Sequence, residues 1–157
     1  SNVQLMAKEF IKAKGSMFLG RGTSFPIALE GALKLKELSY LHAEGYPAGE
    51  MKHGPLALIE KGLPVIVIAP KDKYFEKTLS NMQEVISRGG KILFITDNKK
   101  ELINENIRFG IRVPSIDSLL APILLTIPLQ LLAYHVALLK NCDIDKPRNL
   151  AKSVTVE

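Results

Sequence analysis

Two short runs of consecutive apolar residues constrain the fold of this chain more than any other feature. Residues 64–69 and 92–96 are rich in β-branched and aromatic side chains and show no alternation between apolar and polar positions. A strand with one face in water alternates, whereas a strand of a parallel sheet is covered on both faces and does not. We therefore predict a parallel sheet buried between two layers of helices.

The rest of the chain supplies further strands and the helices that cover them. Residues 16–19 and 107–113 are predicted as two more strands, and helices are predicted over 3–14, 27–41, 74–88 and 119–139. This alternation is typical of parallel βαβ units. At 157 residues the chain suits one domain with one core. The predicted fold class is α/β, a three-layer α/β/α sandwich with a parallel, flavodoxin-like sheet.

Three shorter predictions complete this outline. Residues 45–47 are expected to end the second helix, so that His42 lies on it. Thr23 and Ser24, which precede Pro26, are expected to cap the start of that helix. The first helix is expected to turn Leu5, Met6, Phe10 and Ile11 to one side.

Residues 119–139 form an apolar run without a single Asp, Glu, Lys or Arg. The run reaches the roughly 20 residues that a membrane span needs. However, Pro122 and Pro128 interrupt it, and Gln130 and His135 lie inside it. Together with the α/β pattern of the remaining chain, these residues favour a core or subunit-interface helix over a span. Because this helix is apolar on all sides, we expect the chain to form a homo-oligomer.

The helix predicted over 27–41 is apolar almost all the way round, which indicates a largely buried helix, yet it carries a narrow charged sector. Glu30, Lys34 and Glu37 fall within roughly 60° of one another on a helical wheel. They fit either ordinary i,i+4 and i,i+3 ion pairs or the wall of a cleft in which Glu37 acts as a base beside a lysine. Spacing alone favours the ion pairs.

The remaining chemical groups give weaker signals. Among the three histidines, His53 is the best acid–base candidate, because it stands between charged residues and a helix-breaking Gly-Pro pair. His42 and His135 are expected to be structural. Residues 20–24 resemble a phosphate loop in outline, but an ordinary strand-to-helix turn uses the same residues. No spacing predicts a metal site, the single Cys142 excludes an internal disulfide, and no cofactor is expected.

The net charge of +5 comes from scattered lysines that are not interleaved with aromatic residues. This pattern favours solvated surfaces over a nucleic-acid interface. A mild positive field also favours anionic substrates such as sugar phosphates. A single cysteine suits a reducing compartment, and we expect a cytoplasmic protein bound to neither nucleic acid nor membrane.

The last sixteen residues, 142–157, form a tail with Pro147, paired charges and apolar-polar alternation. Terminal residues are usually loose unless something ties them down, so a tail of this kind suggests docking. A docked Lys152 is a candidate reactive amine. We therefore divide the chain into a domain over 1–141 and a C-terminal active-site tail over 142–157.

Several segments together resemble a known family. Residues 18–22, 28–37, 42–44 and 49–55 resemble a sugar isomerase (SIS) domain. The ending, residues 147–157, is more specific and resembles the C-terminus of the glutamine–fructose-6-phosphate aminotransferase family, enzymes that make glucosamine 6-phosphate and glutamate from fructose 6-phosphate and glutamine. The resemblance covers only the second of two SIS halves. It therefore implies a first SIS half and a glutaminase domain as partners in a longer chain, and a homodimer.

The resemblance also implies roles for four residues. Lys152 matches the lysine implied to form a Schiff base with the open-chain ketose, and Glu37 matches the glutamate implied to move the proton between C1 and C2. Lys34 matches a lysine implied to help at the sugar hydroxyls. His53 matches a histidine implied in ring opening across the subunit interface. Glu30 is still interpreted as a structural ion-pair partner of Lys34.

Two alternatives to an active isomerase half stay open. The chain could be a stand-alone regulatory SIS module that binds a sugar phosphate without catalysis. It could also fold and dimerise by itself yet be inactive, because the resemblance implies that the first SIS half supplies most of the Ser/Thr loop that grips the phosphate. The absence of a Ser/Thr cluster directly after residue 69 agrees with that division.

Overall fold

The sheet has five strands within residues 2–100 and 107–150, the part of the chain that the computed structural model describes. The strands are β1 (Gly15–Gly20), β2 (His42–Pro47), β3 (Pro64–Ile68), β4 (Lys91–Thr96) and β5 (Ile107–Arg112). All neighbouring strands pair in parallel, in the order β2-β1-β3-β4-β5. This is the flavodoxin-like order, with its reversal between β1 and β3. The predicted fold class is confirmed.

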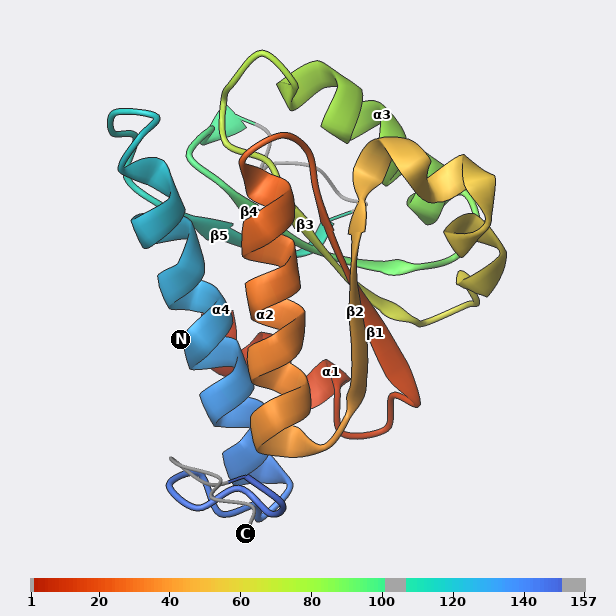
Figure 1. Cartoon of the computed structure of the whole chain (residues 1–157). Helices are drawn as coiled ribbons and strands as arrows, with labels where there is room; N and C mark the ends of the chain where they lie inside the picture. Colours follow the sequence, from red (N-terminus) through yellow and green to blue (C-terminus); the bar gives the residue numbers. More distant parts are fainter. Residues whose placement is uncertain (1, 101–106, 151–157) are drawn as a thin grey trace, which may run out of the picture.

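Helices cover both faces of the sheet (Figure 1). One face carries α1 (Asn2–Glu9), α2 (Ser24–Ser39) and α4 (Ala121–Leu139). The other face carries α3 (Phe75–Ile86) and two short 3₁₀ helices, η1 (Ala48–His53) and η2 (Pro55–Leu58). Gly54 separates these two 3₁₀ helices, and Pro55 begins the second.

Side chains of the central strands alternate between two buried layers. In β4, Leu93 and Ile95 pack into the core under α1, α2 and α4. Ile92 and Phe94 pack into the core under α3 and η1. The absence of polar alternation in the sequence therefore reflects two buried faces, as predicted.

The region after α2 differs from the prediction. The helix ends at Ser39 rather than near residue 45, and His42–Pro47 forms the edge strand β2, so His42 lies on a strand and not on the helix. Tyr40 ends α2 with a left-handed backbone (φ 59°, ψ 16°), and its N–H donates to the carbonyl of Lys36 at 3.0 Å. The strand escaped prediction because its sequence lacks the apolar run that marked the other strands.

Two local predictions, the cap of the second helix and the apolar face of the first, need correction. Thr23 precedes α2 but makes no side-chain capping hydrogen bond. The first helix ends at Glu9, and only part of its predicted apolar face is buried. Met6 and Phe10 are fully buried, whereas Leu5 and Ile11 are 48% and 43% exposed. The buried stripe is narrower than predicted because α1 packs mainly against α4 and β5.

The long apolar run forms α4, which packs against α2 and α1. Within the described residues it is one helix whose length and hydropathy would suffice for a membrane span, and 39% of its most apolar window is buried in the fold. Its buried side includes Leu125, Leu129, Leu132 and Val136. The opposite side is not covered and carries the exposed residues Ile123, Ile127, Leu131, Tyr134 and Leu138. The helix is thus a core element with a second, open apolar face.

Strand β2 is stabilised by polar contacts among its own side chains. Glu44 accepts a hydrogen bond from the Tyr46 hydroxyl, and its other carboxylate oxygen lies 3.2 Å from Nε2 of His42. The hydrogen bond to Glu44, supported by burial and by the charge of Glu44, raises the pKa of Tyr46 to about 12. The neutral hydroxyl is favoured because a tyrosinate would face a carboxylate.

Alkaline pH is therefore expected to weaken the fold through Tyr46. The ordinary pKa of this group is 10.0, so above that pH the unfolded chain loses a proton that the folded chain keeps. The stabilisation is complete below about pH 10 and is lost as the pH rises towards 12. We expect the melting temperature to fall more steeply between about pH 9.5 and pH 11.5 in the wild type than in Tyr46→Phe. Equal slopes in thermal melts would contradict this account.

Gly20 closes β1 where the chain turns into α2. A Cβ atom here would lie 2.2 Å from the carbonyl oxygen of Ser24, which is backbone and cannot move alone. We expect Gly20→Ala to lower the free energy of unfolding by about 1–3 kcal/mol. Gly49→Ala is the matched control, since the atoms nearest to its methyl group would belong to the Arg21 side chain, from 3.0 Å, and not to the backbone. Urea titration by circular dichroism compares the two, and equal midpoints would refute the argument.

Candidate functional site

The charged sector of α2 forms a compact ion-pair cluster. Nζ of Lys34 lies 2.7 Å from a carboxylate oxygen of Glu37 and 3.9 Å from one of Glu30. The Lys34 and Glu37 side chains are 31% and 30% exposed. The hydrogen bond to Glu37 raises the pKa of Lys34 above its ordinary value, although burial opposes this. Lys34 is therefore a firmly protonated cation beside the candidate base.

The predicted burial of α2 holds for one side only. Its buried residues recur at helical spacing and include Ala28, Ala32 and Leu35. Leu29 and Leu33 are exposed instead. The charged cluster therefore lies on the flank of a helix that is buried on one face, where a neighbouring segment can reach it.

The chain after α4 reverses direction and returns to α2. Asn141 adopts a left-handed backbone (φ 54°), and the N–H of Cys142 donates to the carbonyl of Ala137 at 2.9 Å, which ends α4. A carboxylate oxygen of Asp143 then accepts the N–H groups of the second and third residues after it, both at 3.0 Å. Figure 1 shows this segment below the end of α2, in blue.

The returning segment is attached to the end of α2 through Tyr40. The N–H of Arg148 donates to the Tyr40 hydroxyl oxygen at 2.9 Å. The Arg148 guanidinium lies 4.1 Å from the centroid of the same ring. The described part of the tail, up to Leu150, is thus docked as expected.

Two cavities lie between α2 and this segment, and Lys34, Glu37 and Leu150 line both. The first, of about 430 Å³, is also lined by Leu33, Lys36, Tyr40 and Arg148. The second, of about 770 Å³, is also lined by Leu38, Ile144, Asp145, Lys146 and Pro147. These volumes are within the range of small-molecule sites. An ion pair in mostly apolar walls suits a proton transfer on a small polar ligand.

Comparison with known proteins assigns a family to this geometry. The family model of the SIS domain matches residues 9–140. The chain belongs to the SIS domain family. The resemblance drawn from its motifs is confirmed.

Individual relatives of this SIS domain are longer proteins. Glutamine–fructose-6-phosphate aminotransferase (isomerizing) from Agrobacterium fabrum is 58% identical over 99% of this chain, which is 26% of that relative. The C-terminal domain of glucosamine-fructose-6-phosphate aminotransferase from Francisella tularensis has a TM-score of 0.87 and 48% identity, over 92% of this chain and 41% of that chain. Glucosamine-6-phosphate deaminase from Thermotoga maritima has a TM-score of 0.72 and 28% identity, over 99% and 46%. This SIS domain thus spans about a quarter of the length of the curated relatives it matches.

Two of the predicted site residues are not brought to Glu37 by the described structure. Lys152 lies outside the described residues. His53 ends η1, on the opposite side of the sheet from α2, and lines neither cavity. Its Nδ1 lies 2.7 Å from a carboxylate oxygen of Glu50, and its side chain is 73% exposed. The roles of both residues stay predictions.

The loop that resembles a phosphate loop is contacted by side chains of the domain itself. Arg21 donates to the amide oxygen of Asn81 at 3.1 Å, and its guanidinium lies 5.9 Å from the centroid of the Tyr74 ring. At Gly22 (φ 53°), a Cβ atom would lie 2.5 Å from that ring. Glycine is required here because the tyrosine covers the loop.

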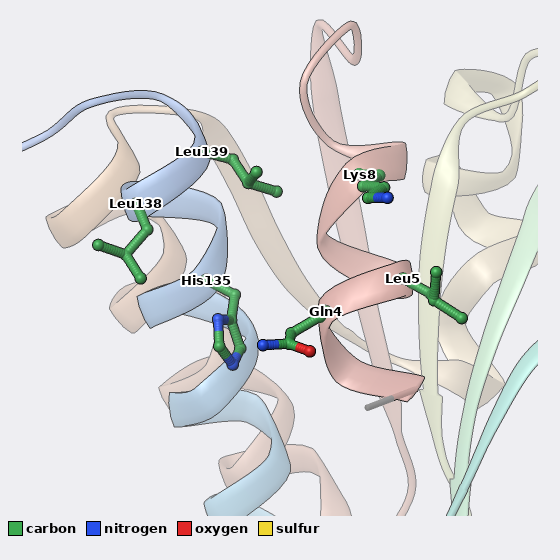
Figure 2. A pocket seen from close by; sticks show the side chains of 6 residues that line it. All are labelled: Gln4, Leu5, Lys8, His135, Leu138 and Leu139. Carbon is green, nitrogen blue, oxygen red and sulfur yellow. The ribbon is translucent and has the colours of Figure 1, made fainter.

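A further cavity, of about 520 Å³, lies between α1 and α4 (Figure 2). Its lining consists of Gln4, Leu5, Lys8, His135, Leu138 and Leu139. Figure 2 shows the Gln4 and His135 side chains facing each other across it. The Tyr134 ring packs edge-to-face against His135 with centroids 5.2 Å apart. This cavity shares no residue with the two at Glu37.

Sequence reasoning missed Tyr40 and Arg148. Tyr40 stood inside the predicted helix, so nothing marked it as the point where the chain turns. Arg148 lies in the tail, and no partner was predicted for it. Its contact with Tyr40 joins residues that are 108 positions apart in the sequence. Within residues 2–100 and 107–150, no three His, Cys, Asp or Glu side chains gather closely enough to hold a metal ion.

Proposed function

We propose that this SIS domain is the second SIS half of an enzyme that makes glucosamine 6-phosphate and glutamate from fructose 6-phosphate and glutamine. Within it, the domain carries the ketose-to-aldose isomerisation. The observation that carries the proposal is the docking of the segment before Lys152 beside Lys34 and Glu37. The 58% identity to an aminotransferase of this name supports it.

Lys152 is placed near Glu37 in this proposal by covalent geometry. Leu150 lines both cavities together with Glu37. Two further residues span at most about 7 Å between Cα atoms. A lysine side chain extends the reach further, so its amine and the Glu37 carboxylate can act on the same small substrate.

The proposed reaction begins with the amine of Lys152 adding to the C2 carbonyl of the open-chain ketose, and water leaves as the imine forms. The protonated imine acidifies the C1 protons. Glu37 removes one of them, which gives an enolamine, and returns a proton at C2. Before this proton transfer, ammonia from glutamine replaces the lysine nitrogen at the C2 imine and frees Lys152, so that the transfer leaves the amino group on C2 and the aldehyde at C1. No electrons enter or leave overall.

Lys34 supports this chemistry as a fixed positive charge. Its raised pKa keeps the ammonium protonated beside Glu37. It balances the carboxylate in the unliganded site and can donate to sugar hydroxyls when a substrate is bound. Glu30, at 3.9 Å, holds the same ammonium from the other side and keeps a structural role.

A second copy of the chain completes the site in this proposal. His53 lies across the sheet from Glu37, so one copy cannot present both to one sugar. The homodimer would use the open apolar face of α4 with the neighbouring exposed residues of α2. The first SIS half and the glutaminase domain would belong to the longer chain, and we propose a cytoplasmic location.

Exchange of Glu37 tests the proton transfer. In the full-length enzyme, we expect Glu37→Gln to lower kcat by about 10²–10⁴-fold with little change in KM, because it removes a group that acts in the transition state. Glu30→Gln is the matched control and should stay within about threefold of the wild type, because it loses only a weak ion pair. Formation of glucosamine 6-phosphate from fructose 6-phosphate and glutamine is the measurement. Wild-type kcat in Glu37→Gln would refute the role.

Interruption of the apolar face tests the dimer. We expect the chain to associate in pairs, and Leu131→Lys to weaken the association by at least about tenfold, because a charge would be buried at its centre. Leu58→Lys is the control, since Leu58 is also exposed, at 59% against 45% for Leu131, but lies on η2. Sedimentation velocity measures both. A dimer of unchanged affinity in Leu131→Lys would rule out this face.

A further inference from the structure

The end of α2 carries a tyrosine at a position where helices commonly carry glycine. Tyr40 has φ 59° and ψ 16°, in the left-handed region that a Cβ atom disfavours. Its backbone N–H closes the helix on the carbonyl of Lys36. A glycine would make this turn without strain, so the geometry of the turn does not explain the tyrosine. Its side chain must supply the reason.

That side chain makes two different contacts with one residue of the tail. The hydroxyl oxygen accepts the backbone N–H of Arg148 at 2.9 Å, and the ring lies 4.1 Å from the guanidinium carbon. The first contact fixes the path of the main chain, and the second fixes the side chain. Together they set both the position and the direction of the chain at Arg148.

Tyr40 is also held firmly relative to Glu37. Glu37 lies in the last turn of α2, Tyr40 caps that turn, and both line the same cavity of about 430 Å³. The turn is tightened by Ser39, whose buried hydroxyl donates to the carbonyl of Leu35 at 2.6 Å and accepts the N–H of Leu41 at 3.4 Å. The candidate base and the attachment point of the tail therefore move as one body.

We propose that Tyr40 is a positioning residue for the proposed isomerisation. It anchors Arg148 and so determines where the chain beyond Leu150, which carries Lys152, starts in relation to Glu37. The inference rests on the proposed Schiff-base role of Lys152. It adds a residue that does not touch the substrate but acts through the tail.

The test uses the full-length enzyme and follows Lys152 directly. Borohydride reduces the imine formed with fructose 6-phosphate, and peptide mass spectrometry gives the rate of labelling at Lys152. We expect Tyr40→Phe to lower this rate and kcat by about fivefold, the factor of one net hydrogen bond, with KM for fructose 6-phosphate unchanged within about twofold. Tyr40→Leu, which also loses the ring, should lower both rates further, by about twentyfold.

Three comparisons isolate the anchor from general stability. Tyr74→Phe removes a hydroxyl at the start of α3, from a residue that lines neither cavity at Glu37, and should match the wild type. Arg148→Ala leaves the end of α2 intact and should slow labelling by about threefold, so it replaces Tyr40→Leu if that variant does not fold. Hydrogen exchange at the Arg148 amide should become about fivefold faster in Tyr40→Phe and stay unchanged in Tyr74→Phe.

The outcomes separate this inference from the proposed function. Wild-type labelling rates in both Tyr40→Phe and Arg148→Ala would overturn the positioning role and leave the isomerase proposal standing. A lower melting temperature with unchanged kcat per folded molecule would show a purely structural role and overturn it as well. Labelling of the wild type at a lysine other than Lys152 would overturn both.

Discussion

The close packing of α2 is the contact on which the rest of this structure depends. At Gly31 a Cβ atom would lie 2.8 Å from Leu129 of α4 and 3.0 Å from the ring of Phe18 of β1. At Gly45 a Cβ atom would lie 2.9 Å from the backbone nitrogen of Leu29. Two glycines thus allow one helix to press against the sheet and against α4. Lys34, Glu37 and Tyr40 of the candidate site take their positions from this helix.

Because of this packing, the two sides of α2 have different roles: one packs in the core and the other presents charged residues. The side towards the sheet carries small and apolar residues, and its charged flank stays accessible because α4 covers only the adjacent sector. Glu37 and Tyr40 are consequently presented by a rigid element, which proton transfer and tail docking both require. A substitution at a buried residue of α2, such as Ala32 or Leu35, would therefore move Glu37 and Tyr40 together.

The sequence predicted the parts of this arrangement that leave a pattern among neighbouring residues. Buried strands show as apolar runs, and the charged sector of α2 shows as a spacing, so the layers, the parallel sheet and the cluster at Glu37 were all predictable. The edge strand β2 was not, because an edge strand needs no continuous apolar run and His42–Pro47 has none. The contact of Tyr40 with Arg148 was beyond local reasoning, since it joins α2 to a segment that only the complete fold brings near it.

The edge of the sheet at which the site lies follows from chain direction. In a parallel βαβ unit the helix starts at the carboxyl edge and ends at the amino edge, so the last turn of α2 and the end of α4 meet at the amino edge. Ligands of such sheets usually bind at the carboxyl edge, at the reversal of strand order, but here Tyr74 covers that loop. The loops that follow the strands lie at the carboxyl edge, so a site at the amino edge cannot be built from them. It needs a segment that continues beyond α4 and returns, which is the course that the chain takes to Arg148.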